Sequence, residues 1–530
     1  MVKMKRSTFN LSHENKLTCD MGQLVPVMCE LALPGDTWKC RINATMRVSP
    51  LLAPLMHNVR LYFHTFSVPL RLLMNEQDWE NFITGGLNND DSSILPYFKM
   101  TSGIETGSLL DYLGFPSNSS ATTNTGLPNN NLSGIEISAL PVRAYNLIMN
   151  EWYINENLQS PLSLSKDMGL DTTTTIKLQN RNWRKDYFTG NLPFQQRGPN
   201  IILPLGSSAP VVGNGKTLGL TNGSQEAGFM PYLNTSVHSL RNAPINSGVG
   251  TASSSSSWTM DASLGVTTNP NNSGVIADLS ANSAGANFSD FIAANAIYQF
   301  AVRQARGGAR YVETLLSQFG VRSSDARLQR PEFIGGGVSQ LVVTPVLQTS
   351  STDTVSPQGN MAGQAFTAQR SKQFKHFFEE HCIVMTLMSI MPATSYQQGI
   401  RRQWMYKTRY DFPFPVFSHM PEQATYLGEL YATSDNTANY STFGFNPRYQ
   451  ECRTIPDSVH GEFRTSLNYW HMGRIFGNTP ALNSAFVTSD PTKRVNAVTI
   501  EHNCWCDIGF DIRAKRCLPK SGHPNLKTAI

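Results

Sequence analysis

The stretch from Thr37 to Val48, TWKCRINATMRV, constrains the fold more than any other part of this 530-residue chain. Apolar side chains occupy alternate positions from Trp38 through Ile42 to Met46, and polar side chains, several of them cationic, take the positions between. Strand side chains alternate between faces with this period, whereas an amphipathic helix repeats every three to four residues. The stretch is therefore predicted to be a β-strand with a buried face and a basic outer face.

A second strand is predicted after a turn that contains Pro50 and Pro54. In the stretch 57–68, HNVRLYFHTFSV, apolar side chains occur at both parities, so both faces of this strand need cover. Two early strands that must be covered by the rest of a long chain favour a β-sandwich. Its core is expected to begin with Trp38, Ile42, Met46, Val59, Leu61 and Phe63.

The composition supports an all-β fold with long loops. Apolar residues make up 40% of the chain and charged residues only 15%, while Gly and Pro are abundant, with 39 and 30 copies. This profile is typical of many strands with long connections and fits a helical enzyme poorly. The net charge of +5 is too small to make the whole chain a nucleic-acid binder, so any basic function must be local.

The sequence suggests a protein made in the cytoplasm with reduced thiols. The N-terminus, MVKMKRSTFNLSHENK, has no apolar run that could serve as a signal peptide, and no stretch is apolar enough for a membrane span. Eight cysteines in so long a chain do not form a disulfide framework. We expect them to act as small buried hydrophobic residues.

The predicted organisation is an N-terminal arm at residues 1–36 followed by one domain at 37–530. Within that domain, residues 206–289 are rich in Ser, Asn, Gly and Thr and nearly lack Lys, Arg and Glu, which predicts an ordered surface insertion, although a disordered linker is the simpler alternative. Helices are expected at 70–84, 141–157 and 291–318, the last one interrupted at Gly307-Gly308. Further strands are expected at 338–347, 377–391, 403–410 and 504–513.

Catalytic and cofactor motifs are missing from the sequence. The fragment GNGKT at 213–217 lacks the earlier glycine of a phosphate-binding loop, because Pro210 stands at that position. Cys504 and Cys506 are separated by one residue and have no partner pair, which argues against a zinc site. The sequence therefore predicts no catalytic residue, no metal and no cofactor.

Basic clusters remain as candidate functional residues. One lies at each end of the chain, and a third mixes cations with Trp183, Tyr187 and Phe188, a combination that could contact single-stranded nucleic acid by phosphate pairing and base stacking. An ordinary solvated surface is the competing interpretation of each cluster. The candidates are Lys3, Lys5, Arg6, Arg181, Arg184, Lys185, Arg513, Lys515, Arg516 and Lys520.

Several segments together resemble the major capsid protein of the Microviridae, single-stranded DNA bacteriophages, especially the gokushovirus branch. They occur in order from about residue 9 to residue 487, and the stretch 206–289 matches poorly. They read FNLSHENKLTCDMGQLVPV, MHNVRLYFHTFSVPLRLL, WENFITGG, RAYNLIMNEWYINENLQ, ARGGARYVETLLSQFGV, RPEFIGGGVSQLVV, SYQQGIRRQW, FGFNPRYQECR and LNYWHMGRIFGNTPALNSAF.

The resemblance implies a single eight-stranded antiparallel jelly roll with very long inter-strand loops that carry a few short helices. Sixty copies would assemble into a T=1 icosahedral shell, the virion capsid, around a circular single-stranded DNA genome that the basic clusters would contact from inside. Internal or scaffolding proteins and pilot proteins of the phage would be partners. In this family an inserted loop forms threefold protrusions proposed to contact a host receptor, and 206–289 is the candidate here.

Contacts between copies are expected to use aromatic and proline-rich stretches. The candidate residues are Phe412, Phe414, Phe417, Phe443, Phe445 and Tyr449. Two alternatives from other classes were weighed. A jelly-roll lectin or adhesin would bind glycans through 206–289, and a cupin-like metalloenzyme would need clustered histidines and a glutamate.

Overall fold

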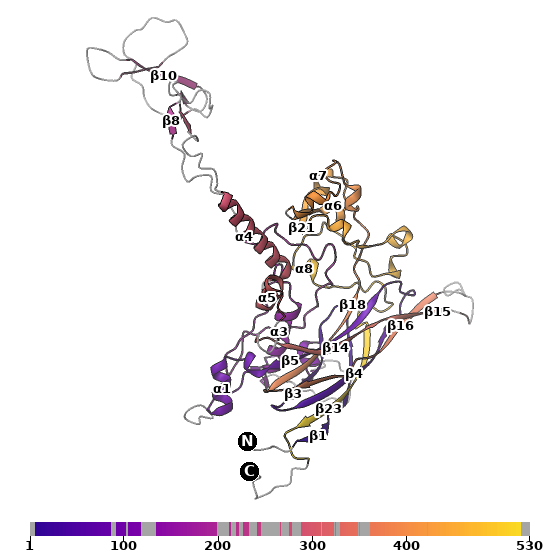
Figure 1. Ribbon diagram of the computed structural model, residues 1–530. Helices are drawn as coiled ribbons and strands as arrows, with labels where there is room; N and C mark the ends of the chain where they lie inside the picture. The colour runs from indigo at the N-terminus through magenta and orange to yellow at the C-terminus, as the bar shows by residue number, and fades with distance from the viewer. Residues whose placement is uncertain are drawn as a thin grey trace. The chain divides into compact units, whose positions relative to one another are not determined.

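The computed structural model (Figure 1) consists mostly of strands in antiparallel sheets, with few helices, in agreement with the predicted all-β class. Contacts divide the chain into two compact units, one formed by 1–197 with 303–530 and the other by 198–302. The structure describes residues 6–85, 92–101, 104–117, 134–198, 211–213, 219–221, 226–232, 241–244, 265–266, 275–277, 288–308, 310–322, 324, 329–347, 349, 361–420 and 422–520.

The larger sheet of the first unit has seven strands, all paired antiparallel. Its order is β1-β23-β4-β16-β15, with β2 pairing with β23 and β17 pairing with β4. The strands are β1 (Ser7–Asn10), β2 (His13–Cys19), β4 (Thr37–Val48), β15 (Val342–Leu347), β16 (Met361–Arg370), β17 (Phe374–Phe377) and β23 (Cys504–Arg516). The first and last strands of the chain therefore lie side by side in this sheet.

The second sheet has four antiparallel strands in the order β14-β5-β18-β3. They are β3 (Val25–Ala32), β5 (Val59–Pro69), β14 (Glu332–Gln340) and β18 (Cys382–Pro392). β18, CIVMTLMSIMP, is buried along its whole length. A strand with apolar residues at both parities needs cover on both faces, and this strand has it.

The main core lies between the two sheets. β4 alternates buried and more exposed residues as its sequence predicts, and its buried side chains pack with those of β5, β18 and β23. The six predicted core residues are 0–1% exposed: Trp38, Ile42, Met46, Val59, Leu61 and Phe63. Their burial fixes which face of each sheet points inward, because side chains alternate along a strand.

A second core covers the other face of the four-stranded sheet. Phe66 of β5 and Met385 of β18 point away from the first core and pack against a helical layer. This layer contains α2 (Leu109–Tyr112), α3 (Leu140–Ile148) and the π-helical turn η2 (Met149–Tyr153). The prediction that both faces of the second strand are covered is confirmed by these contacts.

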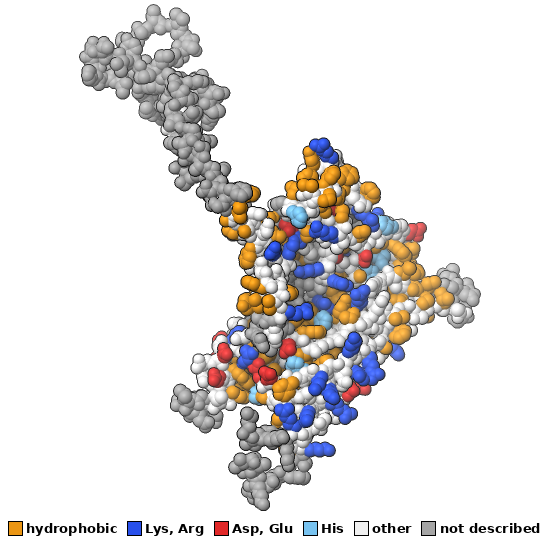
Figure 2. Space-filling model, viewed as in Figure 1, with side chains coloured by type: hydrophobic (Ala, Val, Ile, Leu, Met, Phe, Trp, Pro, Cys, Tyr) orange, Lys and Arg blue, Asp and Glu red, His pale blue; other side chains and the backbone are white. Residues whose placement is uncertain are grey.

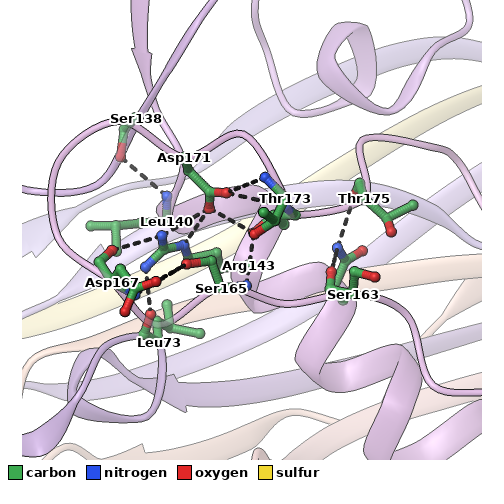
Figure 3. A network of polar contacts seen from close by, with 12 residues as sticks. Leu73, Ser138, Leu140, Arg143, Ser163, Ser165, Asp167, Asp171, Thr173 and Thr175 are labelled. Atoms are coloured by element: carbon green, nitrogen blue, oxygen red, sulfur yellow. Dashed lines mark hydrogen bonds and ion pairs between the residues drawn. The ribbon is translucent and has the colours of Figure 1, made fainter.

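A buried ion pair attaches the helical layer to its loop. Arg143 on α3 and Asp171 have fully buried side chains, with 2.8 Å between Arg143 Nη2 and Asp171 Oδ2. The same guanidinium donates to the carbonyls of Leu73 and Asp167, both at 2.9 Å, and Figure 3 shows these groups converging on it. Thr173 and Thr174 donate backbone N–H groups to Asp171. The guanidinium therefore holds three chain segments together.

The remaining elements of this unit are short. Some of them surround a third apolar cluster that contains Tyr187, Phe188 and Phe443. The elements are η1 (Leu70–Leu72), α1 (Glu76–Thr84), β6 (Tyr97–Lys99), β7 (Glu136–Ser138), α5 (Tyr311–Phe319), β19 (Ser395–Tyr396), η4 (Arg402–Trp404), η5 (Pro415–His419), β20 (Gln423–Tyr426), α6 (Leu427–Leu430), α7 (Asn436–Asn439), β21 (Thr442–Asn446), η6 (Gln450–Cys452), β22 (Asp457–Ser458), η7 (Gly461–Arg464), η8 (Asn468–Trp470) and α8 (Ser484–Val487).

Most of the predicted insertion at 206–289 lies outside the described residues. Its described parts are short strands in two small antiparallel sheets, β8 with β13 and β11-β10-β9-β12. The strands are β8 (Val211–Gly213), β9 (Gly219–Thr221), β10 (Glu226–Tyr232), β11 (Arg241–Pro244), β12 (Gly265–Val266) and β13 (Val275–Ala277), and helix α4 (Phe288–Gly307) follows. The predicted break after Gly307 is present, because α5 starts only at Tyr311.

Two sequence predictions are wrong. The described part of the predicted arm, residues 6–36, belongs to the sandwich, because β1 and β2 pair with β23, and β3 is an edge strand of the four-stranded sheet. The sequence of β2 does not show a clear strand pattern, because one face of this strand is solvent-exposed and the other is only half-buried. The strand predicted at 403–410 is a single 3-10 turn, η4, followed by bends. No strand pairs with this segment within the described residues.

Candidate nucleic-acid interface

A row of cations crosses the outer face of the seven-stranded sheet. Arg513 on β23 lies directly opposite Lys39 on β4, and Lys39 lies opposite Lys375 on β17. All three residues are exposed and alternate with buried neighbours, or with half-buried ones for Lys375, so their side chains point away from the core. Opposed side chains in an antiparallel pair lie about 5 Å apart at Cβ. Three chain segments thus contribute to one row.

The same face carries further outward cations. We call the outward-pointing surface of β2, β4, β16, β17 and β23 the basic face, and Figure 2 shows Lys and Arg gathered over this part of the sheet. Its cations are Lys16, Lys39, Arg41, Arg47, Arg370, Lys375, Arg513 and Lys515. Its carboxylates are Glu14, Asp507 and Asp511, so positive charge predominates.

This arrangement of opposed cations lowers the stability of the free protein, which favours a role in binding an anionic ligand. Like charges directly opposite one another on adjacent strands are destabilising. Among the described residues, Lys39, Lys375 and Arg513 have no carboxylate within ion-pairing distance. A polyanion such as a nucleic-acid backbone would remove the repulsion and release counterions.

Arg516 does not belong to the basic face, although the sequence groups it with Arg513 and Lys515. It stands at an inward position of β23, and its Nε lies 2.9 Å from Oδ2 of Asp36, whose side chain is fully buried. The same oxygen accepts from the indole N–H of Trp38 at 3.1 Å. Arg516 is therefore a structural residue that neutralises a buried carboxylate.

The cluster around Arg181 lies on the other side of the sandwich. The Arg181 guanidinium stacks on Tyr62 at 4.6 Å and donates to Ser389 Oγ at 3.0 Å, which places it on the outer side of the four-stranded sheet. Arg184 and Lys185 are exposed nearby. These three candidates cannot act on the same surface as Arg513 and Lys515.

The aromatic residues of that cluster cannot stack on bases. Trp183, Tyr187 and Phe188 are 6%, 4% and 2% exposed. Tyr187 donates its hydroxyl to Glu429 at 2.6 Å, and burial raises the pKa of Glu429 despite the nearby Arg402 guanidinium. The predicted stacking role is wrong, because apolar packing rather than solvent surrounds these rings.

The remaining terminal candidates are partly described. Lys3 and Lys5 lie outside the described residues. Arg6 is exposed, and its guanidinium lies 5.6 Å from the ring of Phe377, at the end of the basic face. Lys520 is exposed at the last described position.

The candidate contacts between copies separate into two groups. Phe412 and Phe414 are 56% and 45% exposed, and Phe417 is half-buried. Phe443 and Tyr449 are buried within this chain, at 8% and 6%, and Phe445 is half-buried. Neighbouring Val416 and Met420 are exposed as well, at 83% and 50%. Among these candidates, the segment around 412–420 is therefore the part that exposes apolar surface to another molecule.

Most of the cysteines are buried as the sequence predicts, but Cys452 is exposed, and Cys29 and Cys517 are half-buried. Cys40, Cys382, Cys504 and Cys506 are buried, and every cysteine in the part of the chain that the structure describes is a free thiol. Burial raises the pKa of the Cys40 and Cys382 thiols to about 12, so these groups stay protonated and unreactive at neutral pH. Their role is packing.

The residues that the structure describes contain neither a metal-binding cluster nor a membrane-spanning helix. No group of three or more His, Cys, Asp or Glu side chains there is arranged to hold a metal ion. Within the same residues, no helix has the length and apolarity needed to cross a membrane.

Comparison with known proteins supplies the family. The model of a family described as "Capsid protein (F protein)" matches residues 1–526. The capsid protein VP1 of Chlamydia phage 1 is 33% identical over 99% of this chain and 96% of its own length. VP1 of Bdellovibrio phage phiMH2K is 33% identical over 94% of this chain and 91% of its own length. VP1 of Spiroplasma virus 4 is 29% identical over 98% of this chain and 95% of its own length. As the resemblance to microvirus capsid proteins predicts, the chain belongs to the capsid protein (F protein) family.

Proposed function

We propose that this structural capsid protein assembles into a T=1 icosahedral shell of sixty copies that encloses a circular single-stranded DNA genome. The capsid role itself follows from family membership, which also implies that the protein resides in the virion. The shell geometry and the circular genome are inferences from the microvirus resemblance. The glycan-binding lectin alternative has no support from the comparisons.

We infer that the two sheets form an eight-stranded jelly roll. The support is their strand order: β2-β23-β4-β16 in one sheet and β3-β18-β5-β14 in the other. Two neighbours at the centre of each sheet, such as β4 and β23, come from opposite ends of the chain, as in a rolled-up Greek key. In this interpretation β1 extends β2, β17 extends β16, and β15 is an additional edge strand.

The basic face is the surface proposed to contact the genome. The observation that carries this proposal is the register that brings Arg513, Lys39 and Lys375 side by side on an exposed sheet. Phosphate contacts of this kind need no base sequence and weaken as salt is added. The face would then point into the shell.

Other surfaces are assigned to partners by the same inference. The exposed segment with Phe412, Phe414 and Val416 would contact a neighbouring copy, and 206–289 would form the protrusion that meets a host receptor. Scaffolding, internal and pilot proteins of the phage would assist assembly in the host cytoplasm. Interfaces enriched in aromatic residues are typical of such contacts.

The test is the DNA content of assembled particles. The variant Lys39→Gln/Lys375→Gln/Arg513→Gln, expressed with the neighbouring phage genes, should form shells by electron microscopy but package less DNA by absorbance ratio. For unassembled protein, the slope of log affinity for oligothymidylate against log salt should fall by about 1 per cation removed. Arg516 is left intact, because its loss would disturb folding.

A charge-matched control removes three exposed cations outside the basic face, in Lys99→Gln/Lys177→Gln/Arg453→Gln. This variant should keep its DNA content and its salt slope. Equal DNA loss in both triple variants would mean that only net charge matters. Unchanged DNA in the basic-face variant would refute the assignment of this face.

A further inference from the structure

A hollow of about 760 Å³ opens on the basic face beside an exposed tryptophan. Its floor is formed by β2, β4 and β23, and its wall by the loop that carries Gly107 together with helix α2, which ends at Tyr112. Trp505 on β23 lines it and is 47% exposed. The hollow therefore offers a large aromatic surface to an incoming ligand.

The sheet register places a cation next to this ring. Trp505 lies opposite Arg47 of β4, and Arg47 lies opposite Phe366 of β16, which is 44% exposed. An aromatic, a guanidinium and a second aromatic thus follow one another across three strands. Neighbouring strands are about 4.8 Å apart, so the three groups span roughly 10 Å of sheet surface.

The wall of the hollow is already formed in the free protein. Tyr112 donates its hydroxyl to the backbone carbonyl of Thr18 at 2.7 Å, which joins the end of α2 to β2. Gly107 has φ of +77°, and a Cβ there would lie 2.7 Å from the ring of His502, so the loop approaches as closely as glycine permits. The hollow therefore needs no rearrangement to exist.

The acidic groups at the rim are already engaged. Asp507 lies 3.6 Å from Nζ of Lys16, and Asp111 accepts from the backbone N–H of Gly107 at 2.8 Å. Arg47, in contrast, has no ion-pair partner among the described residues. The hollow thus offers one aromatic platform and one uncompensated cation to a ligand.

We propose that this hollow binds an unpaired base of single-stranded nucleic acid, stacked on Trp505, with Arg47 at the adjoining phosphate. Every base has a π-face, so the site tolerates any sequence. Paired bases are stacked inside a duplex and cannot reach the ring, so the site selects single strands. The inference rests on the proposed genome-contacting role of the basic face and adds a strand-type preference to it.

The first test compares single-stranded and duplex probes on unassembled full-length protein. Fluorescence anisotropy would measure the affinity for labelled oligothymidylate and for a duplex of equal length. Trp505→Leu should weaken oligothymidylate binding roughly 10-fold, the loss expected for one stacked base, and leave duplex binding unchanged. Trp505→Phe, which keeps a ring, should retain most of the affinity.

Two further variants sharpen this test. Arg47→Gln should weaken both probes and lower the salt slope by about 1. Trp404→Leu removes a 74%-exposed indole from η4, outside the basic face, and should change neither affinity. If the wild type binds single strands and Trp505→Leu does not weaken this binding, the proposed base site is wrong. The proposed role of the basic face would not be affected by that result. Failure of the wild type to bind either probe would refute the proposed genome-contacting role of the basic face.

A second measurement does not depend on a variant that folds. Particles carrying DNA substituted with 5-bromouracil would be irradiated, and crosslinked peptides identified by mass spectrometry. The peptide containing Trp505 should carry a nucleotide. Crosslinks confined to other peptides would overturn the proposal.

Discussion

The outer faces of the two sheets differ in what covers them. The outer face of the four-stranded sheet, with Phe66 and Met385, is buried under a helical layer and its own apolar core. The outer face of the seven-stranded sheet has exposed residues at alternate positions along β4 and β23, and cations outnumber carboxylates among them. Both sheets share the core on their inner faces, so the contrast is confined to the outer ones.

The contrast shows how one sandwich can serve two purposes. A covered sheet gains apolar burial and a firm attachment for long loops, at about 25 cal/mol per Å² of apolar surface. An uncovered sheet forgoes that gain and leaves a flat, repetitive surface free for a ligand. Opposed cations such as Lys39 and Arg513 would be removed by selection for stability alone. Their presence favours a binding role for this face.

The largest expected effect is on the covered side. Arg143→Met should leave the buried Asp171 carboxylate uncompensated and lower the free energy of unfolding by about 3–5 kcal/mol. The helical layer would detach, and the outer face of the four-stranded sheet would then be uncovered like that of the seven-stranded sheet. Thermal melting of unassembled protein, with a dye that binds exposed apolar surface, measures the loss.

The matched control is Arg71→Met. Arg71 and Glu380 are separated by the same 2.8 Å, but their side chains are 23% and 38% exposed. Solvent can replace this partner, so the loss should be about 1 kcal/mol or less. Equal destabilisation by the two variants would show that burial of the Arg143 pair has no special effect.

The next effect is on the seven-stranded sheet. Arg516→Gln removes the partner of the buried Asp36 and should cost about 1–3 kcal/mol, less than Arg143→Met because Arg516 is 17% exposed and water can partly replace it. Chemical denaturation of the unassembled protein would give the value. The variant Asp36→Asn/Arg516→Gln should recover part of the loss, and a double variant worse than the single one would argue against a charge effect.

A smaller effect is expected from acid. Burial would raise the pKa of Asp171, but hydrogen bonds from Thr174, Arg143 and Thr173 outweigh it and hold this pKa below the ordinary value. The folded state therefore binds the proton more weakly than the unfolded state. The stability from this group is present above the unfolded pKa of about 3.9 and is lost as pH falls through the lowered folded pKa.

Melting temperatures measured between pH 5 and pH 2 would test this direction. The wild type should lose stability progressively below about pH 4. Asp171→Asn, which cannot titrate, should start from a lower stability and show a shallower decline. A decline in the variant as steep as in the wild type would assign the acid sensitivity to other carboxylates.

Much of the fold could be predicted from local patterns. The alternation of β4 identified its buried face, and the apolar residues at both parities of β5 indicated cover on two sides. The strands at the N-terminus could not be found in this way. β2 pairs with β23 nearly five hundred residues away, and its half-buried pattern has little apolar contrast to detect.

The candidate interface could be predicted only in pieces. The sequence identified Arg513, Lys515 and the basic side of β4 separately, but the register that joins them to Lys375 is a long-range property. The inward position of Arg516, in contrast, could be predicted from the strand pattern. Buried residues of β23 alternate from Cys504 to Ala514, and the same parity places Arg516 inward.

The smallest effect tests the basic face directly and has the opposite sign from Arg516→Gln. Arg513→Gln removes one member of the cation row and relieves its repulsion with Lys39, so the free protein should gain about 0.2–1 kcal/mol. The gain should disappear at high salt, because screening already weakens the repulsion. Denaturant unfolding at low and high salt would measure it. A loss of stability at low salt would mean that Arg513 supports the fold, as Arg516 does, and the row would no longer be evidence for a surface kept basic for a ligand.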